Sequence, residues 1–145
     1  AMVVTICSGS VIDSVLAASA LAAIGSGDAE PVLLTPDHAP ALQAAMRPAF
    51  RAVAMRLAPY LESADVSGDS CRLEFAAGMA LDAVRAGTMV EDVVAASVLS
   101  LFHAQASPEL SSAYGAQSER ALRLLHGYIM ACACPGGVRI TPHSV

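Results

Sequence analysis

After Thr35 the large apolar side chains recur every three or four residues, the spacing that places them on one face of an α-helix. Thr35 supplies a capping residue, Pro36 a proline at the first helical position, and Asp37 an acid in the first turn. We therefore expect a long helix that Pro48 kinks or splits and that ends near Pro59. Its apolar face consists of Leu42, Met46, Phe50 (or Ala49), Val53, Leu57 and Leu61.

The stretch Cys7–Asp28 reads as a secretory signal, a cofactor-carrying site or an ordinary helix. A signal peptide needs cationic residues before an uninterrupted apolar core, whereas no Lys or Arg precedes this run and Asp13 interrupts it. A helix explains it better, because Ser10 can cap it with Asp13 three residues later, while Gly25 and Gly27 supply the stop. The expected apolar face is Ile12, Leu16, Ala20 and Ala23.

The sequence Asp-Ser-Val at Asp13–Val15 carries the cofactor hypothesis. It is similar to the Asp-Ser dipeptide on which acyl carrier proteins mount phosphopantetheine. In those proteins the serine lies at a helix N-terminus, whereas Ser14 falls inside the expected first turn. We interpret Ser14 as an ordinary helix residue and expect no cofactor.

A short strand is expected after the polar turn cluster Glu62–Ser70. Within Cys71–Phe75 apolar and charged residues alternate, which is the period-two pattern of a half-buried strand. Its pairing partner is either Val66 or residues 79–84. The sheet is therefore expected to be a small hairpin or a single strand.

Two more helices are expected in the C-terminal half. Thr88 and Glu91 form a capping box for a helix to about Gln105, which has so few polar positions that it should be the most buried one. Ser107–Glu109 starts a last helix that runs to about Ala131. The apolar positions are Val90, Val94, Ala95, Val98, Leu101 and Phe102 in the first, and Tyr114, Ala121, Leu122, Leu125 and Ile129 in the second.

Together these segments predict a mainly α fold, a single domain of four helices with a small β-hairpin or short strand between the second and third helices. The domain spans residues 1–134, and residues 135–145 form a flexible or extended tail. A chain of 145 residues can bury a core without help from disulfides or metal ions. However, 30 of its residues are Ala, which favours helix and buries little apolar area. The larger apolar side chains must therefore form the core.

The charge pattern disfavours nucleic acids and anionic membrane surfaces as partners. The net charge is -5, and the eight basic residues are all Arg, scattered without a run or a basic face. Because phosphate contacts dominate nucleic-acid affinity, we expect no nucleic-acid binding by this chain alone and no membrane binding. Four cysteines in a chain of this size do not form a disulfide framework, so reduced thiols in a cytoplasmic protein are expected.

His103, His126, Cys132 and Cys134 are the residues that could gather a metal ion. The two histidines belong to different expected helices, and the cysteines lack the paired CxxC spacing that is usual for zinc. We interpret His103 as a capping or core histidine and expect no metal site.

Signatures of catalysis are missing from the sequence. It contains no GxSxG nucleophile elbow and no GxxxxGK phosphate loop, and the acids Glu91 and Asp92 are explained by the dipole of an expected helix first turn. We therefore expect no enzyme and assign no catalytic residue. The methionines at 46, 55, 79, 89 and 130 are interpreted as core filler, with an adaptable contact surface as the alternative.

The segments VIDSVLAASA, PALQAAMRPAFRAVAMRLAPYL, SGDSCRLEF, MVEDVVAASVLSLFH and AYGAQSERALRLLHGYI follow one another in a characteristic order. That order resembles small proteins of tailed-phage and prophage structural modules of Bacteroidetes, which look like head–tail connector or tail-completion components. The resemblance implies a non-enzymatic subunit that self-associates and docks in a ring, with other protein subunits as partners. It offers no catalytic residues.

The expected function is therefore that of a structural or assembly protein, a virion component that forms a homo-oligomer or binds virion neighbours. The alternative is a small intracellular helical adaptor, and the third hypothesis is a cofactor- or metal-binding protein. The tail Pro135–Val145 either adds to a neighbour as a strand or frays, and the sequence leaves both open.

Overall fold

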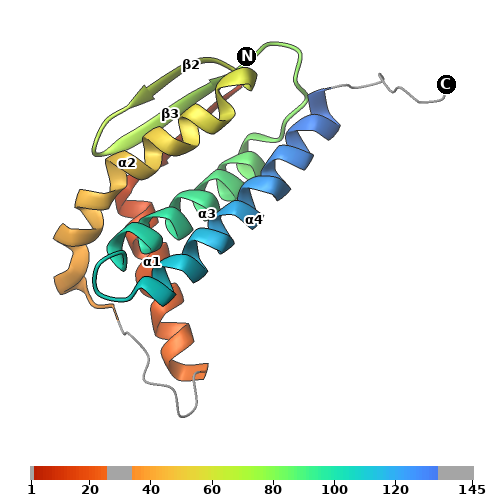
Figure 1. Ribbon diagram of the computed structural model, residues 1–145. Helices are drawn as coiled ribbons and strands as arrows, with labels where there is room; N and C mark the ends of the chain where they lie inside the picture. The colour runs from red at the N-terminus through yellow and green to blue at the C-terminus, as the bar shows by residue number, and fades with distance from the viewer. Residues whose placement is uncertain (1, 26–33, 134–145) are drawn as a thin grey trace.

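A computed structural model describes residues 2–25 and 34–133 of the protein (Figure 1). The expected mainly α fold, with four helices and a hairpin between the second and third, is confirmed. A further strand precedes the first helix. The elements are β1 (Val3–Cys7), α1 (Ser8–Gly25), α2 (Ala39–Leu57), β2 (Leu61–Val66), β3 (Ser70–Phe75), α3 (Ala83–Phe102) and α4 (Pro108–Ala133), with short 3-10 turns at Pro36–His38 and Ala58–Tyr60.

The strands form an antiparallel sheet in the order β1-β3-β2. Val4 lies opposite Leu73 and Ile6 opposite Cys71, so both strands turn apolar side chains to the same buried face. The sequence of β1 does not predict a strand, because five residues joined to an apolar helix show too little alternation to be separated from it. Pairing with the distant β3 makes this segment a strand.

The expected polar turn Glu62–Ser70 is too long, because β2 occupies its first half. The turn itself consists of the residues between β2 and β3. Val66 pairs with Cys71, so the first of the two expected partners is confirmed, and residues 79–84 stay outside the sheet. β2 is an edge strand with mostly exposed side chains. Because it lacks a buried face, its sequence lacks the alternation that predicts a strand.

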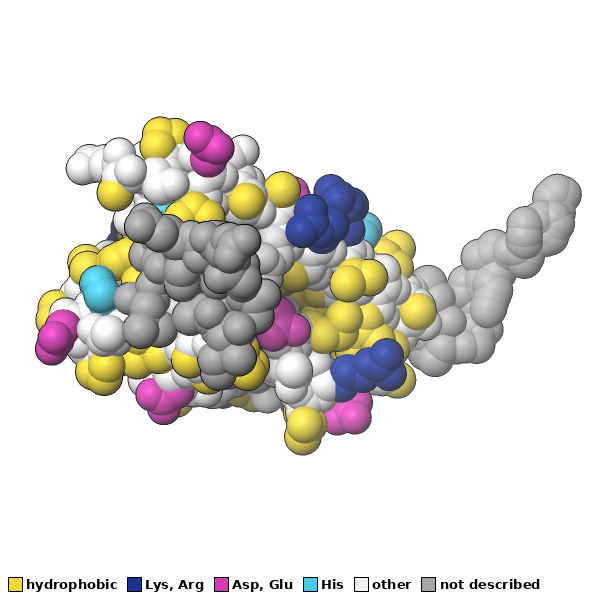
Figure 2. All heavy atoms as spheres, turned by 90° about the horizontal axis from the view of Figure 1, so that it is seen from below, with side chains coloured by type: hydrophobic (Ala, Val, Ile, Leu, Met, Phe, Trp, Pro, Cys, Tyr) yellow, Lys and Arg dark blue, Asp and Glu magenta, His cyan; other side chains and the backbone are white. Residues whose placement is uncertain are grey.

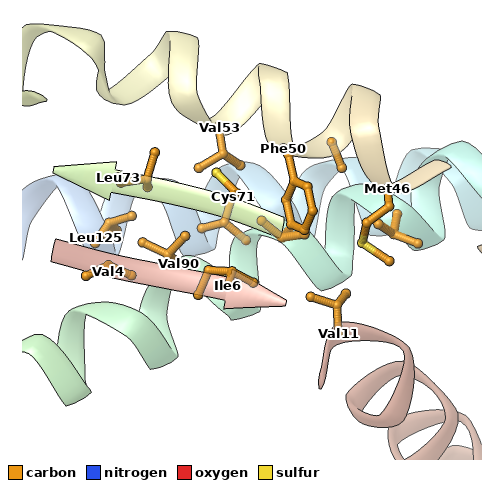
Figure 3. Close-up of a cluster of buried hydrophobic side chains, with 14 of the residues drawn as sticks. Val4, Ile6, Val11, Met46, Phe50, Val53, Cys71, Leu73, Val90 and Leu125 are labelled. Carbon is orange, nitrogen blue, oxygen red and sulfur yellow. The ribbon is translucent and has the colours of Figure 1, made fainter. Parts of the chain in front are cut away.

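The core lies where α2 and α3 meet one face of the sheet, with α4 packed on α3 (Figure 1). Phe50 of α2 points toward Cys71 of β3, and Met46 lies farther along α2 in the same buried cluster, which Val90 of α3 joins near Val4 and Ile6 of β1 (Figure 3). Full burial of one such large side chain stabilises the fold by about 1.5–3 kcal/mol. Helix α3 packs against β1, α1, α2 and α4, which confirms it as the central, most buried helix.

Helix α1 begins earlier than expected. It follows β1 directly at Ser8, so Ser10 and Asp13 lie inside the helix and the predicted cap at Ser10 is wrong. The Ser8 N–H donates instead to the carbonyl of Asp69 in the β2–β3 turn (2.8 Å). A backbone group of the neighbouring turn thus satisfies one of the free N–H groups at the start of the helix.

The buried face of α1 is rotated by one residue from the expected one. Val11 and Val15 are fully buried, while Ile12 and Leu16 are half-buried against the core. Packing of α1 against α2, α3 and β1 decides which of its faces is buried. The expected stop at Gly27 and the tail 135–145 lie outside the described residues.

Helix α3 also begins more than one turn before the predicted capping box, at Ala83 instead of Thr88. Asp82 is the N-cap residue, and its carboxylate accepts a hydrogen bond from the N–H of Val84 (3.0 Å). The predicted box at Thr88 and Glu91 is therefore wrong. The Thr88 hydroxyl donates to the Val84 carbonyl one turn earlier, as mid-helix threonines often do.

Two other expectations for helix ends are confirmed. Thr35 is the N-cap residue ahead of α2, where its N–H donates to Nδ1 of His38 (2.9 Å), and α4 begins at Pro108. Pro48 lies inside α2, on its exposed side, without splitting the helix. Burial of Met46 and Phe50 on the opposite side outweighs the backbone hydrogen bond that a proline removes.

Candidate functional site

A groove of about 470 Å³ runs between α1 and α4 over the central helix α3. Four alanines line much of it, and because their side chains are short the three helices leave a hollow instead of closing over one another. Val15 and Leu99 add larger apolar surface. The alanines are Ala18 from α1, Ala95 and Ala96 from α3, and Ala121 from α4.

Large apolar side chains stand exposed at both sides of the groove. Leu124 of α4 lines it with 69% of its surface exposed, and Leu21, one turn beyond Ala18 on α1, is 70% exposed. Seen from below, hydrophobic side chains form several exposed areas between separate acidic and basic ones (Figure 2). Exposed apolar surface beside a groove is a feature that protein interaction sites share.

One acid and one base face the groove at the same level. Asp92 of α3 and Arg120 of α4 both line it, and the Ser118 hydroxyl donates to the carbonyl of Val93 at this height. Within residues 2–25 and 34–133 the ion pairs are Arg56–Glu119 and Arg72–Glu74, so neither groove charge has an ionic partner. Partial burial raises the pKa of Asp92, and the nearby Glu91 raises it further.

Glu91 joins α1 to α3 at the edge of the groove. Its carboxylate accepts hydrogen bonds from the hydroxyls of Ser10 (3.0 Å) and Ser14 (2.7 Å). Glu91 and Asp92 therefore lie in the middle of α3, and the expected explanation by a helix first turn is wrong. Ser14, the residue of the carrier hypothesis, also lines the groove from inside α1, with its hydroxyl engaged by Glu91.

The structure places three of the four residues considered for a metal ion, and these three lie apart. His103 is buried at the end of α3, where its ring stacks on Tyr114 (centroids 5.6 Å apart) and burial lowers its pKa. His126 lies twelve residues beyond Tyr114 on α4, about 18 Å along the helix. Cys132 lies farther along the same helix, and Cys134 lies outside the described residues. In the described ranges no three His, Cys, Asp or Glu side chains gather as metal ligands would.

The methionines divide between core and surface. Met46 is fully buried, and Met79 and Met89 pack half-buried against the core, as core filler should. Met55 is 76% exposed and Met130 46% exposed, so the core interpretation is wrong for these two. Exposed methionines fit the alternative of an adaptable contact surface.

Sequence reasoning did not find the groove, because its walls come from three helices far apart in the chain. The available signal was the pair Ala95–Ala96 within the most apolar helix. Comparison of the chain with protein-family models, with curated proteins and with solved structures found no match. Among the helices described, none is both long and apolar enough to cross a membrane.

Proposed function

We propose that the protein is a non-enzymatic assembly subunit that pairs with a second copy of itself through the groove of α1, α3 and α4. The observation that carries the proposal is an alanine-lined groove whose two charges, Asp92 and Arg120, have no ionic partner in the described part of the chain. The exposed Leu21 and Leu124 supply apolar surface that a second copy would bury.

The positions of the two charges support a two-fold arrangement of the copies. In a symmetric dimer each contact occurs twice, with the same surface on both copies. Because Asp92 and Arg120 lie at one level of the groove, an axis through that level sets Arg120 of one copy against Asp92 of the other. Leu124 of each copy then faces the small alanines of its partner.

A charge-exchange experiment tests the pairing by analytical ultracentrifugation. We expect the wild-type chain to dimerise with rising concentration, and Asp92→Arg or Arg120→Asp to weaken the dimer by about tenfold or more, as the loss of a charge pair does. The double variant, with both charges exchanged, restores the dimer. Arg51→Asp, on the exposed side of α2, is the control and leaves the dimer unchanged.

Two results would contradict this arrangement. A wild-type chain that stays monomeric at the highest concentration reached removes self-association altogether. A discrete larger ring whose stability ignores both groove charges keeps self-association but removes the two-fold pairing.

The resemblance to head–tail connector and tail-completion proteins supports a virion of a phage or prophage as the setting of this assembly. The genes on either side test that setting. Portal, capsid or terminase genes within a few genes' distance are expected, whereas metabolic or regulatory neighbours would leave the helical adaptor as the better hypothesis.

A further inference from the structure

A second hollow, of about 590 Å³, lies on the other side of α4 from the groove. Its walls are the C-terminal end of α2, the turn Ala58–Tyr60 and the second half of α4. Its volume falls in the range of small-molecule sites, which is roughly 300–1,000 Å³. Among residues 2–25 and 34–133, none lines both the hollow and the groove, so a ligand here would leave the proposed dimer surface free.

The base of the hollow is apolar. Leu57 is 1% exposed and Leu122 7% exposed, and Pro59 adds a rigid edge. Gly127 also lines the hollow, and a Cβ atom built there would meet nothing within 4 Å. The absence of a side chain at this position of α4 thus keeps the hollow open.

One wall is polar and fixed in place. The Tyr60 hydroxyl and Nε2 of His126 are hydrogen-bonded, and their ring centroids lie 5.5 Å apart. When Tyr60 donates to Nε2 of the neutral imidazole, Nδ1–H of His126 remains a donor. The two rings are therefore held against each other across the seam between the turn and α4.

The charges of the opposite wall leave a positive excess. Arg56 forms a bidentate ion pair with Glu119, with N–O distances of 2.9 and 3.2 Å. Arg123, one turn beyond Glu119, makes no hydrogen bond or ion pair with any residue that the structure describes. Two guanidinium groups thus face one carboxylate, and among the described residues that line the hollow none is acidic.

We infer that this hollow binds a small amphipathic oxyanion, a carboxylate or a phosphate monoester on a compact apolar body. The guanidinium of Arg123 receives the oxyanion, because its planar fork of N–H donors matches two oxygens at once. The apolar body rests on Leu57, Pro59 and Leu122, beside the Tyr60–His126 pair. Arg56 remains paired with Glu119 and does not contact the oxyanion directly.

Titration of the full chain with three probes, followed by amide chemical shifts in NMR, tests the inference. Benzoate and phenyl phosphate supply the two oxyanions on one ring, and benzamide is the uncharged analogue. We expect one or both oxyanions to shift the amides of Tyr60, Arg123 and Gly127, and benzamide to bind at least about tenfold more weakly. Whichever of the two binds more tightly shows whether the site prefers a carboxylate or a phosphate monoester.

Two variants locate the site, each with a control. Arg123→Gln removes the guanidinium charge but keeps a polar side chain, and it is expected to weaken oxyanion binding by about tenfold, whereas Arg51→Gln on α2 leaves binding unchanged. Gly127→Leu fills the hollow while improving helix propensity, so it should abolish binding without unfolding the chain. Gly9→Leu, at a helical glycine of α1 that also has open space, is its control.

Three outcomes would overturn the inference: no amide shift with either oxyanion, equal binding of benzamide, or binding that survives both Arg123→Gln and Gly127→Leu. None of them bears on dimerisation, because the charges exchanged in the groove are Asp92 and Arg120.

Discussion

At the scale of single residues, Cys71 and His103 are two titratable groups that lie in the core. Cys71 is fully buried between the sheet and α2, and burial raises the pKa of its thiol to about 11. The thiolate is the reactive form of cysteine, so this thiol is inert at neutral pH. His103 is held in the same way, between Phe102 and Tyr114 at the end of α3.

His103 should make the fold sensitive to acid. Burial lowers its pKa below the ordinary 6.5, so the unfolded chain binds a proton more readily than the folded one. The free energy of unfolding is therefore unaffected by this group above pH 6.5. It falls as the pH drops from 6.5 toward the lower pKa that His103 has in the folded state. We expect His103→Phe, which keeps an aromatic ring on Tyr114, to reduce the loss of stability between about pH 7.5 and about pH 5 in urea unfolding.

The matched control is His126→Gln, at an exposed histidine of α4. If the pH dependence of His103→Phe equals that of the wild-type chain, burial of His103 contributes nothing to acid sensitivity.

At the scale of elements, the helix interiors follow from spacing, whereas their first residues depend on neighbouring elements. The apolar repeat of α2 predicted its buried face, including Met46, Val53 and Leu57. For α1 and α3 the nearest capping pattern in the sequence lay inside the helix. Ser10 and Glu91, one from each false cap, are hydrogen-bonded to each other across α1 and α3.

The start of α3 can be tested with two alanine variants. Asp82→Ala removes the carboxylate that caps Val84 and is expected to lower the free energy of unfolding by about 1 kcal/mol. Thr88→Ala should change it by less than about 0.5 kcal/mol, because alanine's better helix propensity offsets the lost hydroxyl contact. Urea unfolding of both variants measures the difference, and a larger effect at Thr88 would restore the cap that spacing predicted.

At the scale of the whole molecule, α4 separates two candidate surfaces. Arg120, Ala121 and Leu124 face the groove, whereas Leu122, Arg123 and His126 face the hollow beside α2. A single helix can do this because its residues point in all directions around its axis, and only some are needed to pack on α3. The two sites can therefore be removed separately by substitution.

Prediction from sequence reached the fold class but not the sites. Four helices and the strand at Cys71–Phe75 follow from local repeats of apolar residues, which neighbouring positions alone determine. The metal and carrier hypotheses chose residues by chemical type. The candidate surfaces instead depend on alanines, a glycine and arginines. These residues become significant only through the residues of other helices that face them.

By itself the sequence determined that the chain has four helices, which face of α2 is buried, and that α3 is the central helix, because these follow from spacing within one segment. Tertiary structure alone decided that Val3–Cys7 is a strand and that Glu91 joins two helices. It also decided that Arg120 and Arg123 face different surfaces. Each of these depends on contacts between residues far apart in the chain, and no local pattern encodes which distant partner a side chain will meet.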